Sequence, residues 1–339
     1  MVSRSWRWGR RCLLALLSFA AAALAAEGAL RWTPLGERAG SEPPIYPGER
    51  ANRASRAFVA DPEVGWRMRP DVSFRWETEG RAVEYRADAD GFRTGAQRPG
   101  ERRAKLVVLL GDSFVWGYGV PWEETCAALL EAGHADWSVR VLAMPGFGLD
   151  QMWAALRSWA LPLRPDLVVI GIYPDDLDRS FSAWRGREGF TKPFYRLEDG
   201  RPVPRTAADR PGPLALFLAR HSKLAAAARG AERALGKRTG RGRWWALNAA
   251  ILDALQADLE AAGTPFLVVH IPPASWRPLP ALRAHARARG LPFVDLSERF
   301  EEPRSDLYFE HDRHFDADGQ RVLAQVVSEW VAQNVPGLR

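Results

Sequence analysis

Three residues far apart in the chain carry side chains that could together perform nucleophilic catalysis. Ser113 follows the apolar residues 107–110, at a Gly-Asp-Ser sequence where a buried strand should end. A serine hydroxyl is a weak nucleophile until a base removes its proton, and a histidine held by a carboxylate supplies that base. Asp312 and His314 form such a pair, and His311 is a competing histidine. We therefore predict acyl-transfer chemistry, provided that the fold brings His314 to Ser113.

Each of these features also has a structural explanation. A Gly-Asp-Ser sequence is often a turn or a helix cap, and a lone histidine is often a hydrogen-bonded loop residue. Only their combination favours a catalytic site.

The surrounding elements predict an α/β fold. From Lys105 onward, short and mostly continuous apolar runs alternate with helical stretches; the runs are KLVVLL, WSVRVLAM, LVVIGI, TPFLVVHI and LPFVDL. Continuous apolar strands suit a parallel sheet that is covered on both faces. We predict a doubly wound, flavodoxin-like parallel sheet in three α/β/α layers, with the active groups at the carboxyl ends of the strands.

The chain divides on sequence grounds into three parts. Residues 1–30 read as a signal peptide or membrane anchor, residues 31–100 as a small N-terminal region, and residues 101–339 as the main domain. Within the main domain, residues 178–243 interrupt the alternation as a long insertion. This insertion contains KPFYRLEDGRPVP, which predicts a hairpin around Asp-Gly, followed by a helical pattern and a basic tract. It is either a solvated surface insertion or a lid or membrane-resting segment.

The N-terminus has the pattern of an export signal. Arginines within residues 1–11 precede an uncharged run from Leu13 to Ala26, which contains an Ala-x-Ala sequence at 23–25. This run is shorter than the roughly 20 residues that usually span a bilayer, so we expect either a cleaved leader or a short anchor in the inner membrane. Arginines on the N-terminal side place the rest outside the cytoplasm, in the periplasm or on the cell surface.

The charge distribution favours a membrane surface over nucleic acid as a partner. Residues 1–11 carry +4 and residues 220–243 carry +7, which leaves −5 for the rest of a chain whose total is +6. A mildly acidic globular part argues against nucleic-acid binding. The basic insertion and the basic N-terminus suit an anionic lipid surface.

Four motifs in order resemble the blocks of the SGNH (GDSL-like) hydrolases. They are GDSF at 111–114, MPGFG at 144–148, GIYPDD at 171–176 and DRHFDADG at 312–319. A DGFR sequence upstream and the KPFYRLEDG segment look like an exported bacterial subgroup of that family. The resemblance covers most of residues 80–335.

The resemblance implies a serine esterase with a Ser-His-Asp triad. Ser113 would be the nucleophile, His314 the base and Asp312 its orienting carboxylate, while the N–H groups of Ser113 and Gly146 would form the oxyanion hole. The family's longer Asp-to-His spacing would place the carboxylate at His311, which cannot serve. No cofactor is implied. We expect an acyl ester as substrate, either a small molecule or an envelope glycan or lipid that carries an acyl group such as acetyl. An envelope polysaccharide O-acetyltransferase and a non-catalytic glycan-binding relative are the alternatives.

The third motif departs from the family. Asp175 stands where the family has an asparagine that donates to the oxyanion, and a carboxylate has no N–H to donate. Losing one such donor typically costs about 10²–10³ in rate. Three explanations stay open: Asp175 is protonated through burial and the adjacent Asp176, another group donates, or the chain binds more than it cleaves.

Other chemistries have less support in the sequence. GFGLDQ begins like a dinucleotide-binding fingerprint, but Gln151 stands at the third glycine position, and neither GxxxxGK[ST] nor HExxH occurs. His311 and His314 have no clear third partner for a metal ion. We therefore expect neither a metal nor a cofactor.

Overall fold

The computed structural model of the chain describes residues 4–32, 57–96, 103–181, 184–185, 190–205, 212–275, 279–299, 302 and 304–338. By its contacts the chain divides into two units. The smaller unit comprises residues 1–44 and 210–235, and the larger unit comprises residues 45–209 and 236–339.

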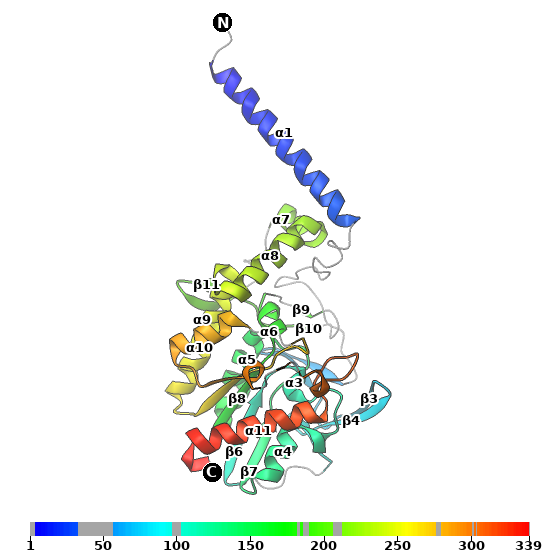
Figure 1. Cartoon of the computed structure of the whole chain (residues 1–339), viewed down its shortest axis with the longest axis vertical. Coiled ribbons are helices and arrows are strands. Elements are labelled where there is room, and N and C mark those ends of the chain that lie inside the picture. Colours follow the sequence, from blue (N-terminus) through cyan, green and yellow to red (C-terminus); the bar gives the residue numbers. More distant parts are fainter. Residues whose placement is uncertain are drawn as a thin grey trace. The chain divides into compact units, whose positions relative to one another are not determined.

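The larger unit is built on one eight-stranded sheet (Figure 1). Five strands are parallel, and each matches one of the apolar runs; they are β6 (Lys105–Leu110), β7 (Trp137–Val141), β8 (Leu167–Ile172), β13 (Phe266–His270) and β14 (Phe293–Asp295). Every residue of β8 and β13 is buried, as expected for strands covered on both faces. The predicted α/β fold is confirmed.

The strand order fixes where a site can form. The parallel strands lie in the order β14-β13-β8-β6-β7, which is the flavodoxin-like order 2-1-3-4-5 when they are numbered along the chain. The chain reverses its direction of winding between β6 and β8, and ligands of such sheets bind beyond the carboxyl ends of the strands at this point. GDSF follows β6 and GIYPDD begins in the last two residues of β8, so both motifs lie at this crevice.

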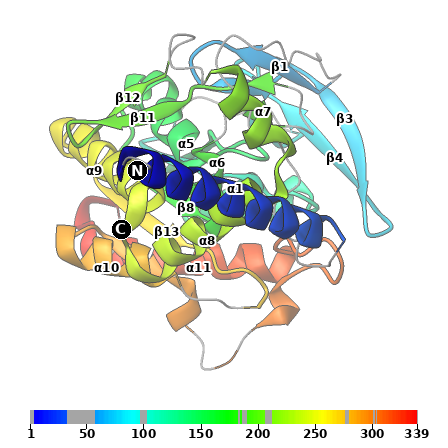
Figure 2. The ribbon, with the colours of Figure 1, turned by 90° about the horizontal axis from the view of Figure 1, so that it is seen from above.

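Helices cover both faces of the sheet (Figures 1 and 2). On one face α11 (Ala317–Asn334) packs against α4 (Cys126–Gly133). On the other face α9 (Gly242–Ala261) packs against α5 (Leu149–Ala155) and α10 (Pro280–Arg289). This division follows from right-handed crossover connections on either side of the reversal point.

The region before residue 100 adds strands to the main sheet. β5 (Arg93–Thr94), β4 (Arg81–Ala87) and β3 (Ser73–Thr78) continue the sheet beyond β7 in antiparallel order. These strands join the N-terminal region to the main domain, because β7 is an edge strand of the parallel sheet and its unpaired backbone groups are bonded by β5. A separate hairpin joins β1 (Phe58–Asp61) to β2 (Gly65–Met68). Residues 33–56 and 97–100 of this region lie outside the described residues.

The insertion contributes to both units. In the larger unit, β9 (Trp184–Arg185) pairs with β10 (Phe190–Thr191), and β11 (Tyr195–Glu198) pairs with β12 (Arg201–Pro204). The second pair is the predicted hairpin, which is confirmed. Its turn residues Asp199 and Gly200 have φ of 49° and 77°, as a two-residue hairpin turn requires.

The smaller unit contains α1 (Arg4–Arg31), α7 (Pro213–His221) and the first part of α8 (Lys223–Thr239). The carboxylate of Glu27, near the end of α1, accepts hydrogen bonds from the Ser222 hydroxyl at 2.8 Å and from the N–H groups of Lys223 and Leu224 at 2.9 Å. Glu27 therefore bonds N–H groups that the first turn of α8 leaves without intrahelical partners. Within α1, residues Arg10–Arg31 are long and apolar enough to cross a membrane.

Candidate active site

The turn after β6 holds Ser113 at the carboxyl edge of the sheet. Asp112 caps the short helix α3 (Ser113–Trp116) by accepting the Phe114 N–H at 3.0 Å. A Cβ on Gly111 would lie 2.4 Å from a methyl group of Val115 and 3.1 Å from the Gly171 carbonyl oxygen. Glycine is therefore needed where the turn passes β8, and the next two residues bring the serine into the crevice.

The structure brings Ser113, His314 and Asp312 together. The Ser113 Oγ lies 2.7 Å from the His314 Nε2, although 201 residues separate them in the sequence. On the other side of the ring, His314 Nδ1 hydrogen-bonds Asp312 Oδ1. This contact assigns the proton to Nδ1, which leaves Nε2 free to accept the serine proton. The geometry is that of a nucleophile, a base and an orienting carboxylate.

The backbone of the loop that carries His314 explains the two-residue spacing. Arg313 has φ of 67°, in the left-handed region, and this reversal lets the side chains on either side of it meet. The Phe309 N–H donates to the His314 carbonyl oxygen at 2.8 Å, and Tyr308 donates its hydroxyl proton to the Pro272 carbonyl oxygen at 2.7 Å. It is His314, and not His311, that lies at the serine.

Aromatic rings flank the imidazole while leaving it accessible. The His314 ring lies 4.9 Å from the Phe114 ring and 4.6 Å from the Tyr118 ring, between ring centroids. The side chain of His314 is 24% exposed and that of Asp312 is 28% exposed. A substrate can therefore reach the His314 imidazole, and the two aromatic rings restrict the rotation of that imidazole.

A buried arginine from the DGFR sequence holds the segment that follows the serine. The Arg93 guanidinium donates to the carbonyl oxygens of Trp116 and Val120, both at 2.6 Å, and to that of Gly117. It also stacks on the Tyr85 ring, 4.6 Å from its centroid. Burial lowers the pKa of Arg93 to about 10, so the group stays charged at neutral pH. The strands before residue 100 thus help to shape the serine turn.

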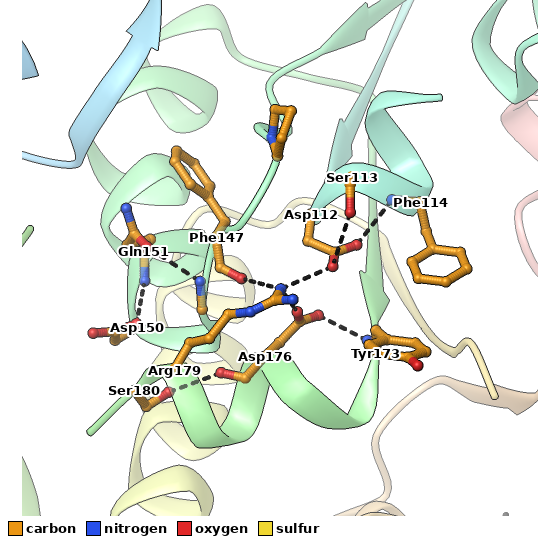
Figure 3. Close-up of polar contacts among 12 residues, drawn as sticks. Asp112, Ser113, Phe114, Phe147, Asp150, Gln151, Tyr173, Asp176, Arg179 and Ser180 are labelled. Atoms are coloured by element: carbon orange, nitrogen blue, oxygen red, sulfur yellow. Dashed lines mark hydrogen bonds and ion pairs between the residues drawn. The ribbon is translucent and has the colours of Figure 1, made fainter. Parts of the chain in front are cut away.

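A half-buried arginine lies beneath the serine turn (Figure 3). Arg179 ends α6 (Pro174–Arg179), and its guanidinium donates to Asp112 at 2.9 Å, to Asp176 at 2.5 Å and to the Phe147 carbonyl oxygen at 3.0 Å. Burial, and then the charge of Asp112, raises the pKa of Asp176 well above its ordinary value. Burial opposes the charge of Arg179, but Asp176 and Asp112 outweigh this effect and raise the Arg179 pKa. This cluster joins the loops that follow β6, β7 and β8.

Comparison with known proteins gives a structural likeness. No family model and no curated protein matches the chain. Among solved structures, it is similar to a lipase/acylhydrolase from Enterococcus faecalis, with 17% identity, coverage of 67% of this chain and 95% of that one, and a TM-score of 0.40. A GDSL-like lipase from Bacteroides thetaiotaomicron has 13% identity, 70% and 93% coverage and a TM-score of 0.41. An acetyl xylan esterase has 12% identity, 67% and 99% coverage and a TM-score of 0.41.

The chain resembles GDSL-type hydrolases in structure. All three TM-scores lie below 0.5, so the function proposed for this chain rests on its own side chains.

Gly146 lies in the loop after β7, whose start is bonded to the serine turn. The Met144 N–H donates to the Gly111 carbonyl oxygen at 3.4 Å, which ties the start of this loop to the turn. Gly146 has φ of 84°, a backbone conformation that favours glycine. Its role as an oxyanion donor stays a prediction.

Asp175 is exposed at the start of α6, and its neighbour is the buried carboxyl group. Asp176 accepts the Tyr173 N–H at 2.7 Å and is fully enclosed, whereas Asp175 faces outward. The burial that the first explanation requires of Asp175 is therefore absent. Adjacent residues at the start of a helix point about 100° apart, and the inward direction belongs to Asp176.

Within the described residues, no group of three or more His, Cys, Asp or Glu side chains is arranged to hold a metal ion. The arrangement at Ser113 needs only its own side chains for acyl transfer.

Proposed function

We propose that this chain is a serine esterase in which Ser113, His314 and Asp312 form the catalytic triad. The observation that carries the proposal is the 2.7 Å contact between the serine Oγ and the imidazole Nε2, with the carboxylate of Asp312 on the opposite ring nitrogen. A binding protein has no need for this alignment, so the contact supports catalysis over glycan binding alone.

The chemistry follows from the positions of these atoms. The Ser113 Oγ attacks the acyl carbon of an ester while His314 Nε2 takes its proton. The same nitrogen then returns the proton to the leaving alkoxide, and an acyl-serine remains. A water molecule attacks the acyl-serine with His314 again as base, which releases the acid and restores the serine. Asp312 stabilises the imidazolium in both halves of the cycle.

The oxyanion formed in each half needs hydrogen-bond donors. We assign this role to the N–H groups of Ser113 and Gly146, which lie on neighbouring loops at the carboxyl ends of β6 and β7. Asp175 stands where an asparagine would supply a donor, and its side chain has no N–H group to donate. The chain is therefore an esterase that lacks one donor unless another group supplies it.

The Asp175→Asn variant is expected to hydrolyse p-nitrophenyl acetate faster than the natural protein. If the amide restores a donor that is missing, kcat rises by up to about 10²–10³. Asp175 is exposed, so the fold should not change, and the loss of a negative charge at the start of α6 should cost less than about 1 kcal/mol. A fall in kcat would contradict the missing-donor account and show that the carboxyl group itself is needed.

The acyl group has two candidate acceptors, water and a sugar hydroxyl. An acyl ester on an envelope glycan or lipid is the substrate class that suits an exported enzyme, and a sugar hydroxyl could replace water as acceptor. Acetate release from acetylated xylan and from p-nitrophenyl acetate should be measured with and without added oligosaccharide. Unchanged acetate release supports hydrolysis, whereas acetylated oligosaccharide formed at the expense of free acetate supports the O-acetyltransferase.

We also propose that α1 anchors the protein in the membrane with the catalytic unit outside the cytoplasm. The apolar stretch Arg10–Arg31 has 22 residues, close to the roughly 20 that span a bilayer. Within the smaller unit, the Glu27 carboxylate accepts hydrogen bonds from N–H groups at the start of α8. These hydrogen bonds join the end of the apolar stretch to the insertion. On α7, Leu214, Phe217 and Leu218 are 71%, 59% and 47% exposed at helical spacing. These side chains suit the acyl region at a membrane surface, and the basic residues that follow suit its headgroups.

The anchor predicts an intact N-terminus in the membrane fraction. The protein should resist extraction by alkaline carbonate, and its intact mass should equal that of the full chain. Replacement of Leu214, Phe217 and Leu218 by serine should leave it anchored but weaken the protection of α7 in hydrogen exchange on vesicles. An intact mass equal to that of residues 26–339 would show that the leader is cleaved and would contradict the anchor.

A further inference from the structure

A carboxylate from the N-terminal strands binds the loop that carries the proposed base. Glu79 and Gly80 form the two-residue turn between β3 and β4, the hairpin at the edge of the sheet (Figures 1 and 2). Glu79 has φ of 50° and Gly80 has φ of 76°. Positive φ is uncommon for residues other than Gly, Asn and Asp, so a glutamate at this turn position points to a role for its side chain.

That side chain reaches three successive backbone N–H groups. One oxygen, Oε1, accepts the N–H groups of His311 and Asp312, both at 2.6 Å, and the other, Oε2, accepts the N–H of Glu310 at 3.1 Å. Successive N–H groups that converge in this way form a concave anion site, called a nest. The hydrogen bonds are charge-assisted, and those to His311 and Asp312 are short.

The contact spans two parts of the chain that the sequence separates by 233 residues. The base of the loop is fixed by its own backbone, through the Tyr308–Phe315 bridge and the bond from the Asp316 N–H to the Leu307 carbonyl oxygen at 3.1 Å. The tip of the loop, residues 310–312, is bonded instead to Glu79. Asp312 therefore has its backbone N–H held by Glu79 and its carboxylate on His314.

We propose that Glu79 is a positioning residue of the triad, which holds the tip of the loop so that Asp312 can orient His314 toward Ser113. The inference rests on the proposed esterase function and adds to it a residue outside the four motifs. Hydrogen bonds, first that from the Asp312 N–H, lower the pKa of Glu79, so its carboxylate is ionised wherever a histidine base is active.

The proposal predicts a loss of kcat without a matching change in KM. Glu79→Ala should lower kcat for p-nitrophenyl acetate and the rate of labelling by a fluorophosphonate by about 10–100-fold, because a base displaced by about 1 Å loses about that much. KM should stay within about twofold. Glu79→Gln keeps one acceptor oxygen and should recover part of the rate, whereas Glu79→Asp is one methylene too short and should behave like alanine.

Glu77→Ala is the matched control, because Glu77 is an exposed glutamate on the same hairpin. In hydrogen exchange, the peptide covering residues 305–316 should lose protection in Glu79→Ala and keep it in Glu77→Ala. A Glu79→Ala variant whose kcat stays within about twofold of the natural protein overturns the positioning role, as does an equal loss in Glu77→Ala. If the natural protein neither hydrolyses esters nor reacts with the fluorophosphonate, the esterase function itself fails.

Discussion

The Ser113→Ala variant is expected to lose about 10⁴-fold or more of the esterase rate while remaining folded. The methyl group cannot attack the acyl carbon, and only transition-state binding by the remaining groups would persist. The Ser113 side chain is small and lies in a capped turn. The melting temperature of the Ser113→Ala variant should therefore match that of the natural protein. Ester turnover under saturating substrate, with Ser73→Ala as an exposed serine control, measures the effect.

The triad residues should also fail to act independently. Because they function as a unit, Ser113→Ala combined with His314→Ala should be no slower than Ser113→Ala alone. A further large loss in the double variant would mean that His314 contributes by a route that does not involve this serine.

The Arg179→Met variant is expected to lower the free energy of unfolding by about 3–5 kcal/mol. Its guanidinium bonds two carboxylates whose side chains are at most 1% exposed, and removing it leaves buried carboxyl groups without a counter-charge. The residue is only 18% exposed, so solvent screens little of this loss. Urea unfolding followed by tryptophan fluorescence measures it. Arg157→Met is the control, since that arginine is 60% exposed and lies 3.8 Å from Asp258, where a change below about 1 kcal/mol is expected.

The direction of the pH dependence gives a second check on the same cluster. Burial, and then Asp112, raises the pKa of Asp176 above that of the unfolded chain, so the folded form gains protons as the pH falls. The loss in free energy of unfolding caused by Arg179→Met should therefore be largest at neutral pH. It should shrink as the pH falls toward about 4, where the aspartates of the unfolded chain also become protonated. Adding Asp176→Asn should recover part of the stability at pH 7. A deficit that grows on acidification would contradict this account.

The sequence was most informative where a strand is buried on both faces. In an α/β protein, a continuous apolar run such as LVVIGI is stable chiefly as a strand that helices cover on both faces. All five parallel strands could therefore be predicted. The short motifs placed Ser113, Gly146 and His314 after strands or in a loop, and the structure brings Ser113 and His314 into contact.

Contacts made across the sheet edge could not be predicted. β5 has two residues and no periodicity to detect, yet it joins β4 to β7 and carries Arg93. Glu79 lies in a turn, where charged residues are ordinary, and its partners come from the other end of the chain. The neighbours Asp175 and Asp176 show the same limit, because the direction in which each points depends on where α6 packs.

The most direct test of the triad is the site at which a fluorophosphonate reacts. After incubation at neutral pH, intact mass and peptide mapping should show one adduct, on Ser113, formed at a rate that falls sharply in His314→Ala. A folded protein that stays unlabelled, or an adduct on a different serine, would contradict the assignment of Ser113 as the nucleophile.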